Sequence, residues 1–206
     1  MTAGFYARRV CPGLVDWAMR GPRLAAYRRR AIAASRGIVL EIGIGTGLNL
    51  LHYPPAVDCV YGIDPSLGLL ARAARRVDAA PRPAVLIGAS AEALPFRDAA
   101  FDTVVMTWTL CSIPRPATAL GEMRRVMKAD GVLLFIEHGA APEAGVRRWQ
   151  DRVTPCWRCV TGGCHLNREI PRLIGAAGFR IDDLETGYMG MPKIATFLYQ
   201  GRAVRE

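Results

Sequence analysis

The chain has 206 residues, of which 51% are hydrophobic and 22% are charged. This is the composition of an ordinary globular protein with room for one α/β domain and little else. No apolar run approaches the roughly 20 residues that span a bilayer, and residues 1–20 lack the apolar centre of a signal peptide. We therefore expect a cytoplasmic protein.

The formal net charge of +9 is concentrated near the N-terminus, because residues 1–36 carry eight arginines and one aspartate, or 8 − 1 = +7. Such a segment can steer an anionic substrate or lie against the inner face of a membrane, and it can equally be a solvated helical face. No base-reading motif accompanies it, and no stacking aromatics are interleaved with its charges. We expect no nucleic-acid partner.

The predicted elements begin with one or two helices over residues 5–35, broken at Gly21-Pro22 because proline cannot continue a helix. Strands and helices then alternate, which indicates parallel strands with crossover helices. The apolar runs that predict strands are 38–42, 57–63, 84–87, 101–108 and 132–136. The stretches that predict helices between them are 66–78 and 116–128.

The last quarter of the chain is harder to interpret. Residues 149–168 fit no simple period, and they precede a short predicted helix over 168–177. Two predicted strands, 179–186 and 193–201, form an antiparallel edge. We expect a single domain over 1–206, divided into a basic helical segment (1–36), a core (37–138), a lid (139–178) and terminal strands (179–206).

A glycine-rich turn follows the first predicted strand, in the sequence Glu41-Ile42-Gly43-Ile44-Gly45-Thr46-Gly47. Glycines let the backbone turn sharply and approach a ligand, and a following helix start adds free N–H groups. The dinucleotide fingerprint needs a third glycine where Leu48 stands, which disfavours NAD. The turn by itself does not identify its ligand.

Asp64 ends the second predicted strand, 17 positions after Gly47. A carboxylate there can accept hydrogen bonds from both hydroxyls of a ribose at the switch point of the sheet. The alternative is an N-cap for the next helix, since Pro65-Ser66 follow directly. The order of the two elements favours ribose binding.

Three further segments complete a pattern: Gly88 to Phe96, Phe101 to Val105, and Met123 to Gly131. Together with the glycine turn and Asp64 they resemble the successive motifs of class I methyltransferases of the ubiquinone/menaquinone-methyltransferase-like kind, over about residues 37–138. The resemblance implies an α/β, Rossmann-like, seven-stranded and mostly parallel sheet, with N-terminal helices and the antiparallel C-terminal edge. It also implies S-adenosylmethionine as cofactor and S-adenosylhomocysteine as product.

The resemblance implies specific cofactor contacts. Glu41 would lie near the cofactor's amino group, Asp64 would hold the ribose hydroxyls, and Thr107 would face the sulfonium. Ser90 stands where the family often has an acid, and its hydroxyl is a weaker acceptor than a carboxylate. The predicted cofactor-binding residues are Glu41, Gly43, Gly45, Thr46, Gly47, Asn49, Asp64, Pro65, Ser90, Ala91, Glu92 and Thr107.

Candidate acceptor residues follow the fifth predicted strand, in Glu137-His138, Trp149-Gln150, Pro155-Cys156-Trp157 and Gly163-Cys164-His165-Leu166-Asn167-Arg168-Glu169. With Leu110-Cys111-Ser112 earlier, they resemble the methyltransferase-like-7 group of thiol methyltransferases. The resemblance favours a small-molecule acceptor with a soft nucleophile. The predicted substrate-binding residues are Trp108, Cys111, Trp157, Cys164 and Arg168.

His138 and His165 are the candidate catalytic residues, because each can act as a general base. The alternatives are a hydrogen bond that anchors the strand-five loop for His138 and a lid-positioning role for His165. Arg168 binds an anionic acceptor or pairs with an acid such as Glu169, and the two tryptophans also suit lid packing.

The six cysteines are expected to be free thiols in a cytoplasmic chain. Cys156, Cys159, Cys164 and His165 form a zinc-ligand set on paper. Only one close pair has the usual spacing, however, and Cys164 and His165 are adjacent, which strains tetrahedral chelation. We therefore expect no metal.

Three functions remain open at this point. The first is methyl transfer to a thiol or other soft nucleophile. The second is methyl transfer to a lipid-like acceptor, a quinone precursor or a phospholipid amine, with the basic N-terminal helices against the membrane. The third is cofactor binding without catalysis. The sequence sets no oligomeric state.

Overall fold

The computed structural model describes residues 13, 16–17 and 19–206. Most of the expected first helix therefore lies outside the described residues. The helices are α3 (Pro22–Ile32), α4 (Leu67–Val77), α5 (Pro116–Val126), α6 (Ala144–Val160), α7 (Ile170–Ala176) and α8 (Lys193–Thr196), with a 3-10 turn, η2, at Leu50–His52. The strands are β1 (Gly37–Ile42), β2 (Val57–Ile63), β3 (Ala84–Ile87), β4 (Phe101–Thr107), β5 (Met127–His138), β6 (Phe179–Tyr188) and β7 (Phe197–Arg205).

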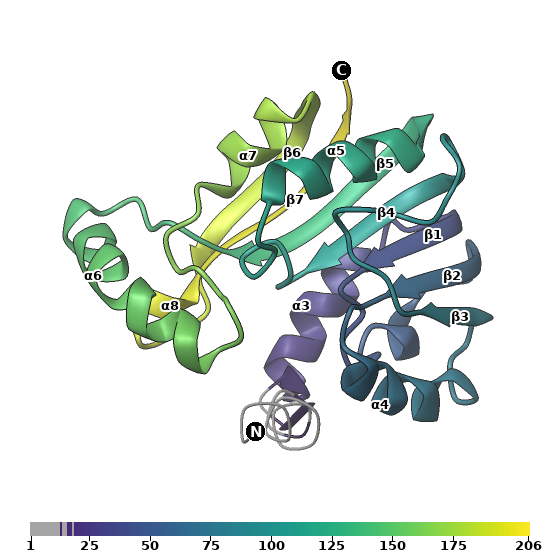
Figure 1. The fold of residues 1–206 in the computed structure, drawn as a ribbon, viewed down its shortest axis with the longest axis horizontal. Coiled ribbons are helices and arrows are strands. Elements are labelled where there is room, and N and C mark those ends of the chain that lie inside the picture. Colours follow the sequence, from purple (N-terminus) through teal and green to yellow (C-terminus); the bar gives the residue numbers. More distant parts are fainter. Residues whose placement is uncertain (1–12, 14–15, 18) are drawn as a thin grey trace.

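The strands form a seven-stranded sheet in the order β3-β2-β1-β4-β5-β7-β6 (Figure 1). β1 to β5 pair in parallel, and β7 pairs antiparallel with β5 and with β6. The strand order reverses direction between β1 and β4, which is the switch point where ligands bind in open parallel sheets. This architecture confirms the predicted fold class.

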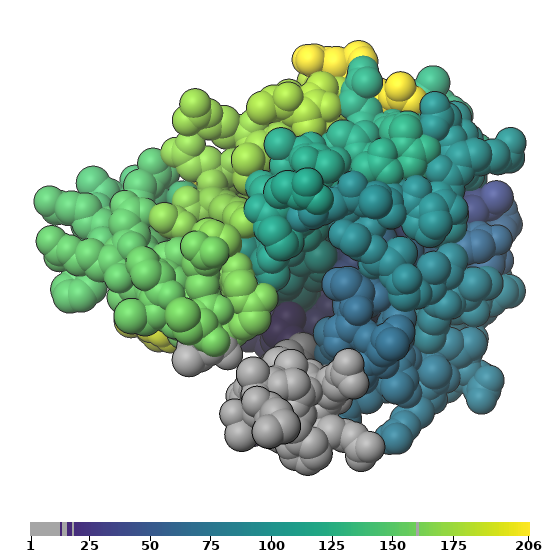
Figure 2. All heavy atoms as spheres, in the orientation of Figure 1, coloured from purple at the N-terminus to yellow at the C-terminus, as the bar shows by residue number. Residues whose placement is uncertain are grey.

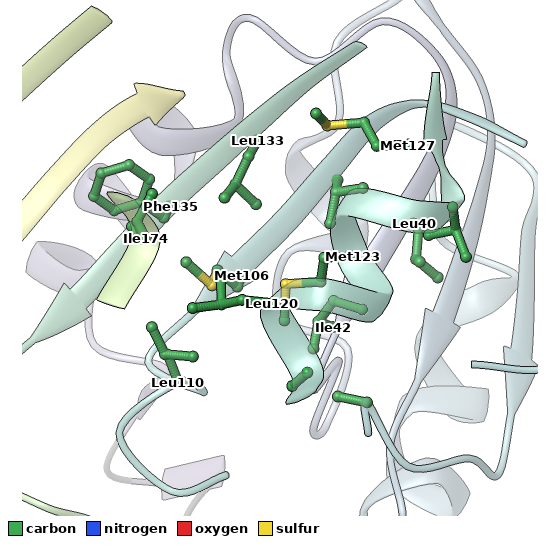
Figure 3. Close-up of a cluster of buried hydrophobic side chains, with 14 of the residues drawn as sticks. Leu40, Ile42, Met106, Leu110, Leu120, Met123, Met127, Leu133, Phe135 and Ile174 are labelled. Atoms are coloured by element: carbon green, nitrogen blue, oxygen red, sulfur yellow. The ribbon is translucent and has the colours of Figure 1, made fainter. Parts of the chain in front are cut away.

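The strands at the centre of the sheet are buried on both faces, because their apolar residues are continuous rather than alternating with polar ones. On one face α5 and α7 cover Leu133 and Phe135 of β5. Figure 3 shows these side chains with Leu120 and Met123 of α5 and Ile174 of α7. On the other face Leu134 and Ile136 belong to a second buried cluster, to which α3 contributes Ala31 and Ile32 and α4 contributes Leu70. Two helical layers thus sandwich the sheet and leave the carboxyl ends of the parallel strands for the site.

The structure differs from the sequence prediction in the lid. Residues 144–160 form α6, an α-helix with Pro155 inside it, where the sequence predicted no regular element over 149–168. An interior proline removes one helical hydrogen bond and normally marks a helix end, which masked the pattern. β5 is also longer than predicted, and β7 begins at Phe197 after the short helix α8.

Among the described residues, the helices are all too short or too polar to cross a membrane.

Candidate active site

The glycine turn after β1 lies against the loop that follows β4. Gly43 has a φ of 65°, and a Cβ atom at this position would overlap the side chain of Thr109. Gly45, with a φ of 57°, has only the carbonyl oxygen of Gly43 within 4 Å of such an atom. Both conformations favour glycine, but only Gly43 also needs the missing side chain for close packing.

A buried polar network lies beneath this turn. The Glu41 carboxylate accepts hydrogen bonds from Asn49 Nδ2 and from the Tyr53 hydroxyl, both at 2.8 Å. Asn49 Nδ2 also donates to Thr107 Oγ1 at 3.1 Å, and its Oδ1 accepts from Arg28 Nη1 at 3.1 Å. The network joins α3, β1 and the end of β4 at the expected cofactor site.

Charge is balanced within this network. Burial raises the pKa of Glu41 to about 7, against hydrogen bonds from Tyr53 and Asn49 and the charge of Arg28 that lower it. Burial lowers the pKa of Arg28 to about 10, and the Glu41 carboxylate opposes that shift. The Arg28 guanidinium also lies over the Trp108 ring, 4.8 Å from its centroid. A cationic group of a ligand beside Glu41 would stabilise the ionised carboxylate.

Asp64 directly follows β2 and is buried, with 6% of its surface exposed. One carboxylate oxygen accepts from the backbone N–H of Gly45 at 3.1 Å, and the other accepts from that of Ser66 at 2.8 Å. Ser66, rather than Asp64, caps α4, because its side chain accepts from the N–H of Leu69. Each Asp64 oxygen keeps a second lone pair for a ribose hydroxyl.

The predicted cofactor residues Ser90, Ala91 and Glu92 follow β3. Ala91 is buried, Pro65 and Ser90 are exposed, and Ser90 Oγ accepts from the backbone N–H of Glu92 at 3.2 Å. The Glu92 carboxylate accepts from the backbone N–H and the side chain of Arg115, each at 2.8 Å. The structure thus brings the predicted cofactor residues to one edge of the sheet, with Glu92 already bound to Arg115.

The described part of the N-terminal segment also reaches this edge. Asp16 is buried and bonds Arg76 Nη2 of α4 at 2.8 Å, while Arg76 Nη1 donates to the carbonyl of Thr46 at 2.7 Å. Arg76 therefore links the N-terminal segment to the glycine turn.

The loop after β4 is held by two charged residues, the buried Glu137 and the half-buried Arg168. Glu137 Oε1 accepts from the backbone N–H groups of Thr109 and Leu110, at 2.8 and 2.9 Å. Glu137 Oε2 has no hydrogen-bond partner among the residues that the structure describes. The Arg168 guanidinium donates to the carbonyls of Leu110 and Ile113. Arg168 is thus engaged by backbone carbonyls, and Glu169 pairs with Arg147 and Arg172 instead.

These anchors fix Cys111 beside two other predicted residues. His138 Nε2 lies 2.9 Å from Cys164 Sγ, and Cys111 Sγ completes a group whose ligand atoms all lie within 4.8 Å of one another. Burial alone would lower the pKa of His138, but the Cys164 sulfur raises it overall. The contact with Cys111, and after it the contact with His138, lowers the pKa of Cys164. The contact with Cys164 raises the pKa of the buried Cys111.

The other predicted acceptor residues surround this group. His165 contacts Cys111 through the backbone: its N–H donates to the Cys111 carbonyl at 2.9 Å, and its Nδ1 lies 3.1 Å from the same oxygen. Trp108 has a φ of 51°, rare for a residue with a side chain. Within the described part of the chain, the indole N–H groups of Trp108 and Trp157 are buried without a hydrogen-bond partner.

The lid is attached through Gln150 of α6. Its Oε1 accepts from the N–H of Ala141 at 2.9 Å, and its Nε2 donates to the carbonyls of Gly139 and Ile194 at 3.0 and 3.1 Å. These bonds connect α6 to the end of β5 and to α8, while α6 itself lies beside the sheet rather than on it (Figure 1). Figure 2 shows a recess between the green lid surface and the blue surface near β2 and α4.

Several residues of this region were not predicted as functional. Arg28 lies in the basic segment that the sequence linked to surface charge, and Tyr53 carried no motif-based role. Glu137 was named only within the Glu137-His138 acceptor motif, without a role of its own. The apolar run that leads into Glu137 is a signal for a buried acid. The four residues that the sequence offered as a zinc-ligand set do not come together. Cys156 and Cys159 are exposed on α6, whereas Cys164 lies beside His138 and Cys111.

Comparison with known proteins identifies the family of the chain. Residues 40–135 match the methyltransferase domain family. The chain is 36% identical over 155 residues to a thiol S-methyltransferase of Rattus norvegicus, covering 71% of this chain and 62% of the relative. It is 35% identical over 179 residues to the phosphatidylethanolamine N-methyltransferase of Cereibacter sphaeroides, covering 83% of this chain and 84% of the relative. The chain spans about three fifths of the length of the thiol S-methyltransferases it matches.

Solved structures share the fold at low identity. An S-adenosylmethionine-dependent methyltransferase of Thermotoga maritima superposes with a TM-score of 0.70 at 21% identity, covering 98% of this chain and 99% of that one. A [4+2]-cyclase superposes with a TM-score of 0.69 at 21% identity, covering 89% of this chain and 80% of that one. The cyclase shows that this fold alone does not determine the reaction. The residues at the strand ends and the sequence relatives together identify the family: the chain belongs to the class I S-adenosylmethionine-dependent methyltransferases.

Proposed function

We propose that this protein transfers the methyl group of S-adenosylmethionine to the sulfur of a small thiol. The observation that carries the proposal is the position of Cys111, His138 and Cys164. Cys111 follows the end of β4, and His138 ends β5 just beyond Ile136, which pairs with Thr107. Both therefore lie at the strand ends beside Thr107, where we expect the sulfonium. The group brings two polarisable sulfur atoms and an imidazole together at the strand ends.

The chemistry suits a site that positions its reactants. The donor carries a positive sulfonium, so the acceptor sulfur needs only an in-line approach at the right distance. A thiol with a pKa of about 8.5 is a few per cent ionised near neutrality and needs little help from a base. The buried carboxylates Glu41 and Glu137 add negative charge that favours a cationic donor. His138 and His165 remain candidate bases.

The sequence relatives support the same acceptor class. Thiol S-methyltransferases of Rattus norvegicus and Homo sapiens are 36% and 33% identical to the chain over 155 and 143 residues. Their sulfur acceptors are our reason for choosing a thiol over an amine or a carbon nucleophile. We place the reaction in the cytoplasm, with a small-molecule acceptor as the partner.

A second candidate is methyl transfer to a lipid-like acceptor at a membrane surface. It is favoured by the phosphatidylethanolamine N-methyltransferase, of whose length the chain covers 84%. Arg23, Arg29 and Arg30 of α3 are exposed and could contact anionic headgroups. An amine acceptor must lose a proton before or during transfer, so this reaction asks more of a base than a thiol does.

Release of S-adenosylhomocysteine from a panel of acceptors tests the two candidates. The panel contains an alkyl thiol, hydrogen sulfide, a quinol, and vesicles with and without phosphatidylethanolamine. We expect turnover with the thiols and none with vesicles. Turnover only with phosphatidylethanolamine vesicles supports the second candidate, and tight cofactor binding with no turnover on any acceptor contradicts both.

A further inference from the structure

Cys111, His138 and Cys164 come from three separate segments: the loop after β4, the end of β5, and the turn after α6. Their ligand atoms all lie within 4.8 Å of one another. Two thiols and an imidazole are the donor set that zinc prefers among the ligands that proteins offer. The group is therefore a candidate for metal binding as well as for acceptor contact.

The distances are close to those of a metal site. Zinc bonds of about 2.0–2.3 Å in a tetrahedron place neighbouring ligand atoms about 3.5–3.8 Å apart. The pair His138 Nε2 and Cys164 Sγ, at 2.9 Å, would need to open by roughly half an ångström to fit that geometry. Atoms at the 4.8 Å limit would need to close by roughly an ångström. Side-chain rotation alone can supply shifts of this size.

We infer that Cys111, His138 and Cys164 form a three-ligand site for one zinc ion, with the fourth coordination position open to the acceptor thiol. Three protein ligands and one exchangeable position are the pattern of catalytic rather than structural zinc. This role for the fourth position rests on the proposed function. The acceptor R–SH would bind the ion as R–S⁻ and release its proton to solvent. Its sulfur then attacks the methyl carbon as the bond from that carbon to the sulfonium breaks, leaving a thioether and S-adenosylhomocysteine.

The surroundings hold the ligands in place. Glu137 bonds the N–H groups of Thr109 and Leu110, and Arg168 bonds the carbonyls of Leu110 and Ile113, so both sides of Cys111 are fixed. Ligands held by such outer contacts are preorganised for a metal. Two thiolates neutralise a divalent ion, so the nearby Arg168 does not face a net positive charge.

Metal content and cobalt spectra test the site without relying on activity. Reduced full-length protein is titrated with Zn²⁺ and with Co²⁺, and bound metal is measured by mass spectrometry. We expect about one equivalent per chain and the intense near-ultraviolet absorption of cobalt–thiolate bonds. Cys111→Ser, Cys164→Ser and His138→Ala should each reduce the bound metal several-fold. The double variant Cys156→Ser/Cys159→Ser is the matched control, because both thiols are exposed on α6, and it should bind like wild type.

Three outcomes overturn the zinc site. The first is that the reduced wild-type chain takes up no metal. The second is that the ligand variants bind as much metal as wild type. The third is that the control variant loses as much metal as the ligand variants do. Thermal unfolding of each variant identifies any that fail to fold, and Cys164→His, which keeps a metal ligand, then replaces the failed variant. A metal-free chain that still methylates thiols contradicts the zinc site but leaves the proposed function intact. A zinc-loaded chain without thiol turnover contradicts the proposed function and leaves the metal site.

Discussion

Arg28 donates a hydrogen bond to Asn49 at 3.1 Å and stacks on Trp108, so a residue of the basic N-terminal segment belongs to the buried network of the cofactor site. Arg28→Lys keeps the charge but loses the planar fork and the stacking surface. We expect S-adenosylhomocysteine to bind at least about tenfold more weakly, since one charge-assisted bond contributes about 1.5–3 kcal/mol. Calorimetric titration measures the change. Arg29→Lys on the exposed side of α3 is the control, and equal affinities for the two variants would contradict this role.

Asp64→Ala should reduce cofactor affinity more strongly. The substitution leaves the ribose hydroxyls unpaired and also frees the backbone N–H groups of Gly45 and Ser66. At about 1–3 kcal/mol per lost bond, the dissociation constant should rise by one to several orders of magnitude. Asp58→Ala, at an exposed position of β2, controls for the change in charge. Wild-type affinity in a folded Asp64→Ala protein would remove the central support for ribose binding.

The free energy of unfolding should fall as the pH rises from about 4.5 to about 7, in part because of Glu41. Its folded pKa is about 7 and its unfolded value is near 4.5, so the native state binds the extra proton in this range. The loss at pH 8 is on the order of 3 kcal/mol. Glu137 contributes in the same direction, so the difference between wild type and Glu41→Gln isolates Glu41. Urea unfolding at pH 5 and pH 8 measures it, and parallel pH profiles would show that Glu41 is not the cause.

Binding of S-adenosylhomocysteine should show the opposite dependence on pH. Its ammonium group, if it lies beside Glu41 as the family resemblance implies, binds the ionised carboxylate better than the neutral one. Affinity should therefore rise as the pH increases through about 7, and Glu41→Gln should abolish the rise. A comparison of the two proteins over pH 6–8 decides the point. A rise that persists in Glu41→Gln assigns the dependence to another group.

Gln150→Ala should destabilise the lid. The substitution leaves the Ala141 N–H and the carbonyls of Gly139 and Ile194 without their partner. We expect the free energy of unfolding to fall by at least about 2 kcal/mol. Trp149→Ala, at an exposed neighbour on the same helix, should change it by less than about 1 kcal/mol. Similar losses of unfolding free energy for the two variants would contradict the role of Gln150 in attaching the lid.

The sequence predicted the cofactor half of the molecule better than the acceptor half, for a physical reason. The glycine turn and Asp64 each end a strand, so the sheet itself brings them together, and local signals were sufficient. His138 and Cys164 lie 26 positions apart, and their contact depends on the path of α6, which an interior proline concealed. The burial of Arg28 likewise depends on how α3 packs, which local patterns do not encode.

β7 occupies a position in the sheet between β5 and β6, both of which precede it in the chain. During synthesis, β5 and β6 therefore emerge from the ribosome without the strand that joins them. Their edges stay unpaired until residues 197–205 arrive, and unpaired edges are where chains aggregate. Since β5 also ends in His138, which pairs with Leu198, the geometry of the candidate active site is completed only once β7 has been made.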